Sequence, residues 1–284
     1  MKHAYLILAH GDMPLVPTLL RCIDDARNDI YIHVDRKTLR IPDLHTEKAR
    51  LQILTDRVDV RWGDVSMLEA ELKLFEAALL SGEHYAYFHL LSGVDLPLKT
   101  QDEIHRFCEE NQGKEFIGYC GTEETPEIEW KMHRWHPFPK HFRNENLFYR
   151  GARKAARLIQ DALHIRRHRN MHFLKGAQWV SITEAMAALF VAHKKWIRKT
   201  FRHTFCSDEI AIQTLCWNSP LKANIFSLKG EWAGNLRKIG WKNGDLKDWT
   251  AADYDEIVSS EALFARKFNG SDPAFIEKIA ALSQ

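Results

Sequence analysis

The chain has 284 residues, of which 45% are hydrophobic and 27% charged, a composition that excludes a disordered or fibrous protein. This length is enough for one large α/β domain with a sizeable core, so one catalytic unit is expected over residues 1–284. The formal net charge of +2 gives no reason to expect a nucleic-acid partner.

The amino-terminal segment predicts a strand–helix–strand unit. Residues 4–9 form a continuous apolar run typical of a buried parallel strand, and residues 14–26 have the pattern of an amphipathic helix. A second run, residues 30–34, ends at Asp35. Because α/β proteins bind ligands at the carboxyl ends of parallel strands, Asp35 is expected at the ligand-binding edge of the sheet.

Further strands and helices alternate along the rest of the chain. Strands are predicted at residues 51–55, 58–62, 85–91, 116–119 and 178–182, and helices at residues 66–81, 101–110 (capped by Thr100), 183–193 and 204–216. Residues 121–148 are polar, aromatic and rich in proline, which predicts an irregular binding loop. No internal repeat or low-complexity linker divides the chain.

Several short blocks, in this order, resemble the core-2/I-branching enzyme and peptide O-xylosyltransferase family of glycosyltransferases. They are YIHVDRK at 31–37, Trp62-Gly63 with Ser66, HLLSGVDLPLKT at 89–100, GAQWV at 176–180, SDE at 207–209, Arg237, and LFARKF at 263–268. The first and third blocks are the most specific. Together the blocks span nearly the whole chain.

The resemblance implies a single-domain GT-A-type fold, with a mostly parallel central sheet flanked by helices. Residues 1–120 would form the nucleotide-binding half, and residues 121–284 the acceptor and catalytic half. The implied reaction moves a sugar from a UDP-sugar to an acceptor hydroxyl of a glycan or glycolipid, with inversion at the anomeric carbon.

The resemblance also implies a donor site. Asp35 would accept a hydrogen bond from the uracil ring, and the main chain near Ala9 and His10 would complete the base pocket. Arg237 and Lys267 would hold the diphosphate without a metal ion, so that the UDP-sugar is a substrate and no cofactor is expected. Taken alone, a single aspartate after a strand is more typical of a turn or a helix cap.

Glu209 is the predicted catalytic base, because an inverting transfer needs a carboxylate within hydrogen-bond reach of the attacking hydroxyl. The alternative is structural: residues 207–209 also have the pattern of a helix start, with a serine cap and acids that complement the helix dipole. Both roles are compatible in one residue.

The resemblance assigns acceptor contacts to the irregular stretch. Trp130, Lys131 and Arg134 fall where the family places acceptor and donor contacts, and Trp232 is a further acceptor-side candidate. A tryptophan ring offers a flat apolar face to a sugar. Core packing is the alternative role for each of the nine tryptophans.

No metal site is predicted. Asp253-Tyr254-Asp255 is the only DxD sequence and has the pattern of a capped helix rather than of a loop at a strand end. His164, His168 and His172 have helical spacing, but the neighbouring arginines would repel a cation.

The five cysteines include no CxxC pair, which predicts reduced, mostly buried thiols. The amino-terminal apolar run is too short for a signal peptide or a membrane span, so a cytoplasmic location is expected. Residues 150–169 hold seven Arg or Lys and one Asp. They are expected to form either a solvated helix face or a peripheral contact with anionic lipid at the inner face of the membrane.

The donor sugar is either N-acetylglucosamine or xylose. Two other classes of function remain open, namely a catalytically silent carbohydrate-binding module and a nucleotidyltransferase on a similar sheet. Release of UDP without added metal is expected only from the transferase.

Overall fold

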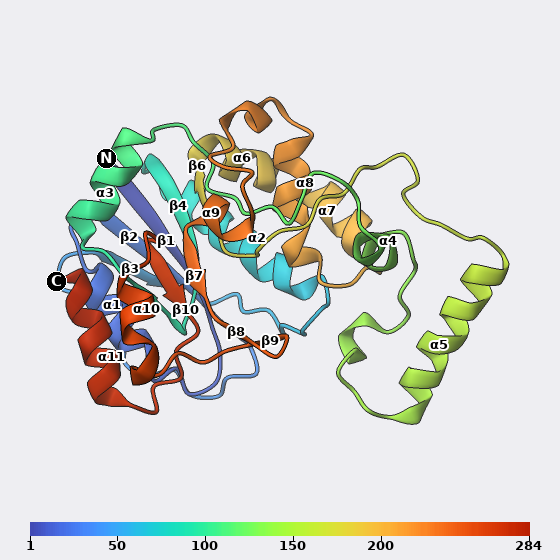
Figure 1. The fold of residues 1–284 in the computed structure, drawn as a ribbon, viewed down its shortest axis with the longest axis horizontal. Coiled ribbons are helices and arrows are strands. Elements are labelled where there is room, and N and C mark those ends of the chain that lie inside the picture. The colour runs from blue at the N-terminus through green and yellow to red at the C-terminus, as the bar shows by residue number, and fades with distance from the viewer.

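The computed structural model describes residues 1–284 as a mixed α/β structure around a five-stranded sheet (Figure 1). The strand order is β3-β2-β1-β4-β6; neighbours among β1 to β4 are parallel, and β6 is antiparallel to β4. The strands are β1 (Lys2–Ala9), β2 (Asn28–Val34), β3 (Arg50–Ile53), β4 (Tyr85–Ser92) and β6 (Ser181–Thr183).

Both faces of this sheet are covered, which explains the continuous apolar runs in its central strands. Every residue of β2 is buried, and so is every residue of β1 after Lys2. Successive side chains of β1 alternate between two separate cores. Leu6 packs in one core and Ile7 in the other.

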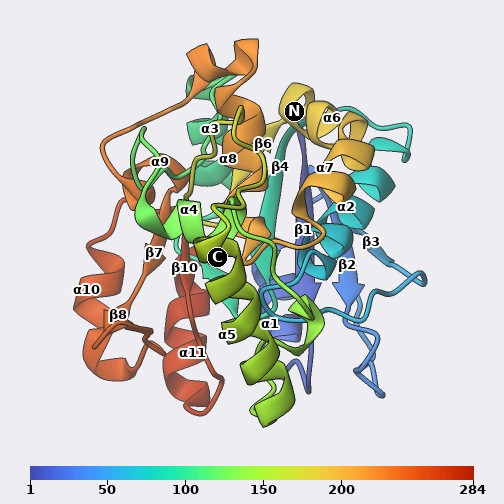
Figure 2. The ribbon, with the colours of Figure 1, turned by 90° about the vertical axis from the view of Figure 1, so that its right-hand side faces the viewer.

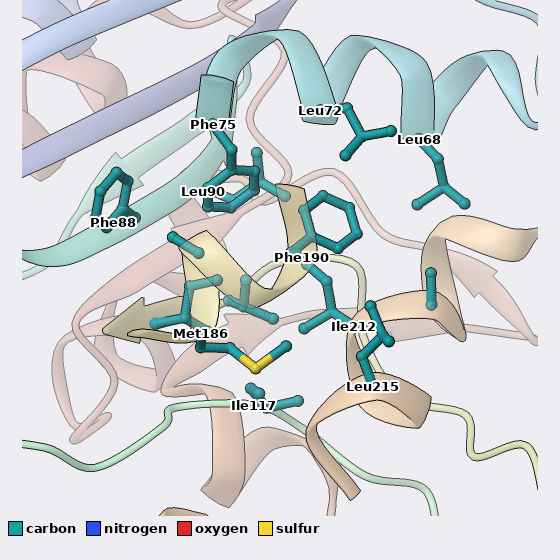
Figure 3. Packing of buried hydrophobic residues seen from close by; sticks show 14 of the residues in the cluster. Leu68, Leu72, Phe75, Phe88, Leu90, Ile117, Met186, Phe190, Ile212 and Leu215 are labelled. Carbon is teal, nitrogen blue, oxygen red and sulfur yellow. The ribbon is translucent and has the colours of Figure 1, made fainter. Parts of the chain in front are cut away.

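Four helices cover the Leu6 face. They are α2 (Ser66–Leu79), α6 (Glu184–Ala192), α7 (Lys194–Phe201) and α8 (Ala211–Trp217). Figure 3 shows Phe75 of α2 against Phe190 of α6, and their ring centroids are 5.4 Å apart in an edge-to-face arrangement. Burial of each such aromatic side chain stabilises the fold by roughly 1.5–3 kcal/mol.

The opposite face carries helices from both ends of the chain. They are α1 (Val16–Ile23), α3 (Gln101–Glu110), α10 (Tyr254–Val258) and α11 (Pro273–Ala280). The predicted cap of α3 is confirmed, because Thr100 and Glu103 form a reciprocal capping box. Carboxyl-terminal residues thus complete a core begun by the amino-terminal strands, which confirms one domain.

Two small sheets lie beside the main one. In the first, β10 (Phe264–Arg266) pairs antiparallel with β5 (Asp95–Pro97) and parallel with β7 (Arg237–Ile239). A hairpin of β8 (Trp241–Lys242) and β9 (Asp245–Leu246) follows, and the short helix α9 (Glu231–Asn235) precedes β7. β10 therefore brings the carboxyl-terminal block 263–268 next to the turn that follows β4.

The stretch 121–148 is more regular than its sequence predicts. Helix α4 (Pro126–Met132) begins with proline in its first turn, and its cap is the Thr125 hydroxyl, which accepts from the Ile128 N–H. Helix α5 (Leu147–Ala162) starts within the same stretch. Figure 1 shows α5 projecting from the body of the molecule at the end of two long connections, and in Figure 2 it faces the viewer.

The predicted fold class, a mostly parallel sheet flanked by helices, is confirmed. The strand predicted at 116–119 is wrong, because only one isolated bridge forms there, between Phe116 and Ser181. No strand forms at 58–62, and the helix predicted at 204–216 is limited to α8 after a 3₁₀ turn at Ser207–Glu209. Short apolar runs do not distinguish a strand from an extended segment that packs without a ladder.

Candidate active site

The carboxyl edge of the sheet brings the predicted base-pocket residues together. The Asp35 N–H donates to the Ala9 carbonyl at 2.9 Å. The Gly11 N–H donates to the Thr38 hydroxyl at 3.1 Å, so the loop after β1, which begins at His10, lies against the loop after β2. Ala9, His10 and Asp35 therefore occupy one edge, as predicted.

Two cations hold the loop that contains Asp35. The Lys37 ammonium lies 2.6 Å from one Asp35 carboxylate oxygen and 2.9 Å from the other. The Arg57 guanidinium donates to the carbonyls of Val34, Asp35 and Thr38, among others. Loop residues fixed by this many bonds to one side chain are preorganised for a ligand. Sequence reasoning missed Arg57, which has no motif around it.

Lys267 lies beside the same edge, directly after β10. The Phe268 N–H donates to the Val94 carbonyl at 3.0 Å, and the Gly93 N–H donates to the Leu8 carbonyl at 2.9 Å. These bonds fix the main chain at Lys267 against the turn after β4. The Lys267 ammonium is partly exposed and lies 3.3 Å from Asp248, a surface contact that a stronger anion can replace.

The neighbouring Arg266 forms a buried ion pair. Its Nε donates to Asp95 at 3.0 Å, and Asp95 in turn accepts from the hydroxyl and the N–H of Ser92. The guanidinium also lies 4.3 Å from the centroid of the Trp179 ring, within cation–π range. Arg266 thus links the turn after β4 to the segment that leads toward Glu209.

Arg237 is not brought to this edge. Its side chain is 1% exposed, and its guanidinium donates to the carbonyls of Asn235 and Val180 and to the Ser181 hydroxyl. Burial lowers the pKa of Arg237 to about 10. In this structure the guanidinium is enclosed by protein, because β7 turns the side chain inward over Phe264.

The predicted base lies in a cluster of opposite charges. Glu209 Oε2 lies 2.9 Å from the Lys131 ammonium and 3.7 Å from the Lys175 ammonium. Both lysines also contact Glu127, each at 2.8 Å. Burial disfavours the charged form of Lys131, but the two carboxylates outweigh it and raise its pKa above the ordinary value. The Glu209 side chain is 34% exposed, so it is open to solvent.

An extended segment at 174–180 connects this cluster to the sheet edge. The Gly176 N–H donates to the Glu209 carbonyl at 2.9 Å, and the Leu90 N–H donates to the Val180 carbonyl at 2.9 Å. A Cβ on Gly176 would lie 1.7 Å from the Gly118 carbonyl oxygen, so only glycine fits there. This explains the GAQWV block, for which the sequence suggested no role.

Aromatic rings surround the cluster on one side. Trp130 packs edge-on against Phe205 with centroids 5.2 Å apart, and Phe205 stacks on Phe142 at 3.7 Å. Gly63 has φ +76°, and a Cβ there would lie 2.3 Å from the Phe205 ring. The Cys206 N–H donates to the Gly63 carbonyl. The Trp62-Gly63 block therefore positions the chain just before Ser207–Glu209.

The other acceptor candidates are dispersed. Lys131 contacts Glu209 directly, as described above. Arg134 instead forms ion pairs with Glu129 and Asp161. Trp232 is half-buried in α9, with its ring 6.4 Å from that of Trp241. Trp130 and Lys131 thus adjoin the Glu209 cluster, whereas Arg134 is engaged with other carboxylates.

The helix start predicted at 207–209 is a 3₁₀ turn instead. It follows Cys206 in the left-handed conformation, and no side chain caps it. Asp208 points into the protein, where burial and then the Glu209 charge raise its pKa to about 7. Burial, with Asp208 as the next cause, also raises the pKa of Glu71 on α2. A buried carboxyl pair thus lies behind the predicted base.

One group of side chains could hold a metal ion, namely His3, His89 and Cys108, all buried. His89 already engages both ring nitrogens, with Ser181 at 2.7 Å and His3 at 3.1 Å. His3 lies at the amino end of β1, away from the predicted donor edge. The DxD sequence is part of a helix start, with Asp253 and Thr250 in a capping box. The prediction that this sequence is a capped helix start is therefore confirmed.

Comparison with known proteins agrees with this arrangement. The Core-2/I-Branching enzyme family matches residues 3–263. The chain belongs to this family. It is 28% identical over 310 residues to xylosyltransferase oxt of Drosophila melanogaster and 24% identical over 297 residues to human xylosyltransferase 2. These matches cover 94% and 95% of this chain and 32% of each relative, so the chain spans about a third of their length.

Two further features of this Core-2/I-Branching family member bear on the earlier expectations. All five cysteines are free, and four of them are buried, as expected. None of its helices is long and apolar enough to cross a membrane. Besides Arg57, Lys175 is a functional candidate that sequence reasoning missed. Lys175 directly precedes the GAQWV block, and that adjacency is the one signal that pointed to it.

Proposed function

We propose that this chain is an inverting glycosyltransferase that moves N-acetylglucosamine or xylose from a UDP-sugar to a hydroxyl of a glycan or glycolipid. The observation that carries the proposal is the Glu209 carboxylate, partly open to solvent and 2.9 Å from the Lys131 ammonium. Membership of a branching-enzyme family and similarity to proteins named xylosyltransferase support the class of reaction.

In the proposed reaction Glu209 accepts the proton of the acceptor hydroxyl as that oxygen attacks the anomeric carbon. The bond between this carbon and the UDP oxygen breaks, and its electron pair leaves with UDP. Attack from the face opposite the leaving group inverts the anomeric centre. Lys131 and Lys175 hold the Glu209 side chain in place, because their ammonium groups lie 2.9 and 3.7 Å from its carboxylate.

The leaving group requires positive charge near the diphosphate. Lys267 is the proposed partner, because its main chain adjoins the turn after β4 and its ammonium is partly exposed. Arg266 lies next to it, but its guanidinium is already paired with the buried Asp95, so Lys267 carries the proposed diphosphate contact. For the base, Asp35 would accept from the uracil N3–H while the main chain at Ala9 and His10 lines the pocket. No metal ion takes part in this proposal.

The test is product analysis in excess EDTA. The protein is incubated with UDP-N-acetylglucosamine or UDP-xylose and a panel of alkyl glycosides, and nucleotide products are separated by chromatography. We expect UDP together with a glycosylated product whose new linkage has the inverted configuration by NMR. Release of pyrophosphate would indicate a nucleotidyltransferase, and binding without turnover of either donor would indicate a carbohydrate-binding module. Either result would overturn the proposal.

A further inference from the structure

Helix α5 is attached to the rest of the protein by few contacts. Its only buried residue is Gln160, whose side-chain amide exchanges two hydrogen bonds with the main chain of Trp135, at 2.7 and 2.9 Å. Figure 1 shows the helix standing out from the body of the molecule. Most of its surface therefore faces outward.

The outward surface of α5 is apolar. Leu147, Gly151, Ala155, Leu158 and Ala162 follow one another at helical spacing and form one row. Phe148 and Ile159 lie beside this row, because Phe148 is three positions before Gly151 and Ile159 is four positions after Ala155. Leu147, Phe148, Leu158 and Ile159 are each more than half exposed. We call these four side chains the apolar stripe.

Cations lie along one flank of the apolar stripe. Lys154 is four positions before Leu158, and Arg150 and Arg157 are four positions before and three after Lys154, so the three cations are neighbours along this flank. All three are exposed, and none forms a salt bridge. These three cations and the exposed apolar row beside them form one surface of α5. A partner that fits this surface must be both negatively charged and apolar.

We propose that α5 lies in the plane of an anionic phospholipid bilayer, with the apolar stripe at the acyl-chain boundary and Arg150, Lys154 and Arg157 among the headgroups. An amphipathic helix with a basic flank has this binding mode in general, because burial of apolar area and attraction to anionic lipid act together. The charge on the flank favours lipid over a second copy of the same helix, since two copies would bring like charges together.

Helix α5 lies next to residues that the proposed function assigns to the acceptor. A cavity of about 210 Å³ is lined by Trp130 and Arg134 on one side and by Arg153, Lys154 and Arg157 of α5 on the other. Docking would bring this cavity to the membrane surface, within reach of a glycan carried by a lipid. This last step rests on the proposed function, whereas the docking itself does not.

The test is co-sedimentation with lipid vesicles, without nucleotide or acceptor. We expect the wild-type protein to bind vesicles that contain phosphatidylglycerol and not vesicles of phosphatidylcholine alone. Binding should weaken as salt is added, because exposed charges are screened. The readout needs no turnover, so failure of docking and failure of the transferase assignment are separable.

Two pairs of matched variants identify the surface. Leu158→Asp with Ile159→Asp should abolish vesicle binding. Leu39→Asp with Leu80→Asp should not, because these leucines, although even more exposed, lie outside α5. Arg150→Gln with Lys154→Gln should weaken binding by about five-fold for each cation removed. The exposed pair Lys195→Gln with Lys199→Gln should have a smaller effect. Circular dichroism and melting curves verify that each variant is folded.

Three outcomes would overturn the proposal. The first is a wild-type protein that stays in the supernatant with every vesicle composition. The second is binding by the α5 variants that equals binding by the wild type. The third is a dimer in sedimentation velocity that Leu158→Asp with Ile159→Asp dissociates, with no vesicle binding by either form; α5 would then be a contact between two copies of the chain.

Discussion

The carboxylate of Glu209 and the ammonium of Lys131 are 2.9 Å apart, and this pair connects two distant parts of the chain. Lys131 lies on α4, and Glu209 ends the 3₁₀ turn before α8. Lys131 is nearly buried while Glu209 is partly exposed. The pair therefore fixes a partly exposed carboxylate at the surface of the protein.

Glu209→Gln should lower the rate of transfer by about 10²–10⁴-fold, the usual contribution of a general base. UDP affinity should stay within a few-fold, because the substitution keeps the shape of the side chain and leaves the donor edge intact. Glu127→Gln is the matched control, since Glu127 contacts the same lysine at 2.8 Å. Full activity of Glu209→Gln would remove the assigned role.

Lys267→Ala should weaken UDP binding, measured by calorimetry, because it removes the exposed cation beside the turn after β4. The loss of one charge-assisted contact corresponds to about 1.5–3 kcal/mol. Lys242→Ala removes an exposed lysine on the nearby β8 and should change little. Equal UDP affinities of the wild type and both variants would contradict a contact between Lys267 and the diphosphate.

Gly63→Ala should destabilise the protein and lower activity. Its Cβ would lie 2.3 Å from the Phe205 ring, and its φ of +76° disfavours any side chain. Gly82→Ala is a close control, with φ +83° and no atom within 4 Å of its Cβ, so it isolates the cost of the backbone conformation. Similar melting temperatures for the two variants would mean that the contact with Phe205 is unimportant.

Stability should depend on the ionisation of Asp208. An unfolded aspartate has a pKa of about 3.9, whereas burial raises the folded-state pKa of Asp208 to about 7. The native protein therefore binds more protons between these values, and the free energy of unfolding should fall as the pH rises through this window. The slope is at most roughly 1.4 kcal/mol per pH unit.

Asp208→Asn should flatten this dependence, because an amide cannot ionise. Chemical denaturation at several pH values measures the free energy of unfolding of both proteins. A wild-type protein whose stability rises from pH 4 to pH 7 while the variant is unchanged would show that the buried carboxyl is already ionised in the native state.

The sheet was predictable because its strands are long apolar runs with both faces covered. The runs at 4–9, 30–34 and 85–91 correspond to β1, β2 and β4. Residues 116–119 have the same composition, but they pack beside the sheet with a single bridge. Local pattern cannot report whether a neighbouring strand is available for pairing.

The sequence predicts which site residues lie at the ends of the strands. It predicts less well which lysine and arginine side chains face the site. Asp35 and Ala9 adjoin because parallel strands end at one edge. Whether Arg237 faces a ligand or the core depends on the orientation of β7, a strand of only three residues whose sequence has no alternation long enough to indicate a face. Lys175 was missed because its partner Glu209 is 34 positions further along the chain.

Calorimetric titration of UDP into the protein in excess EDTA tests the central claim most directly, namely a nucleotide-sugar site at the carboxyl edge of the sheet that requires no metal. We expect saturable one-to-one binding in EDTA that Lys267→Ala weakens. Binding that is absent in EDTA and appears only after manganese is added would contradict this account.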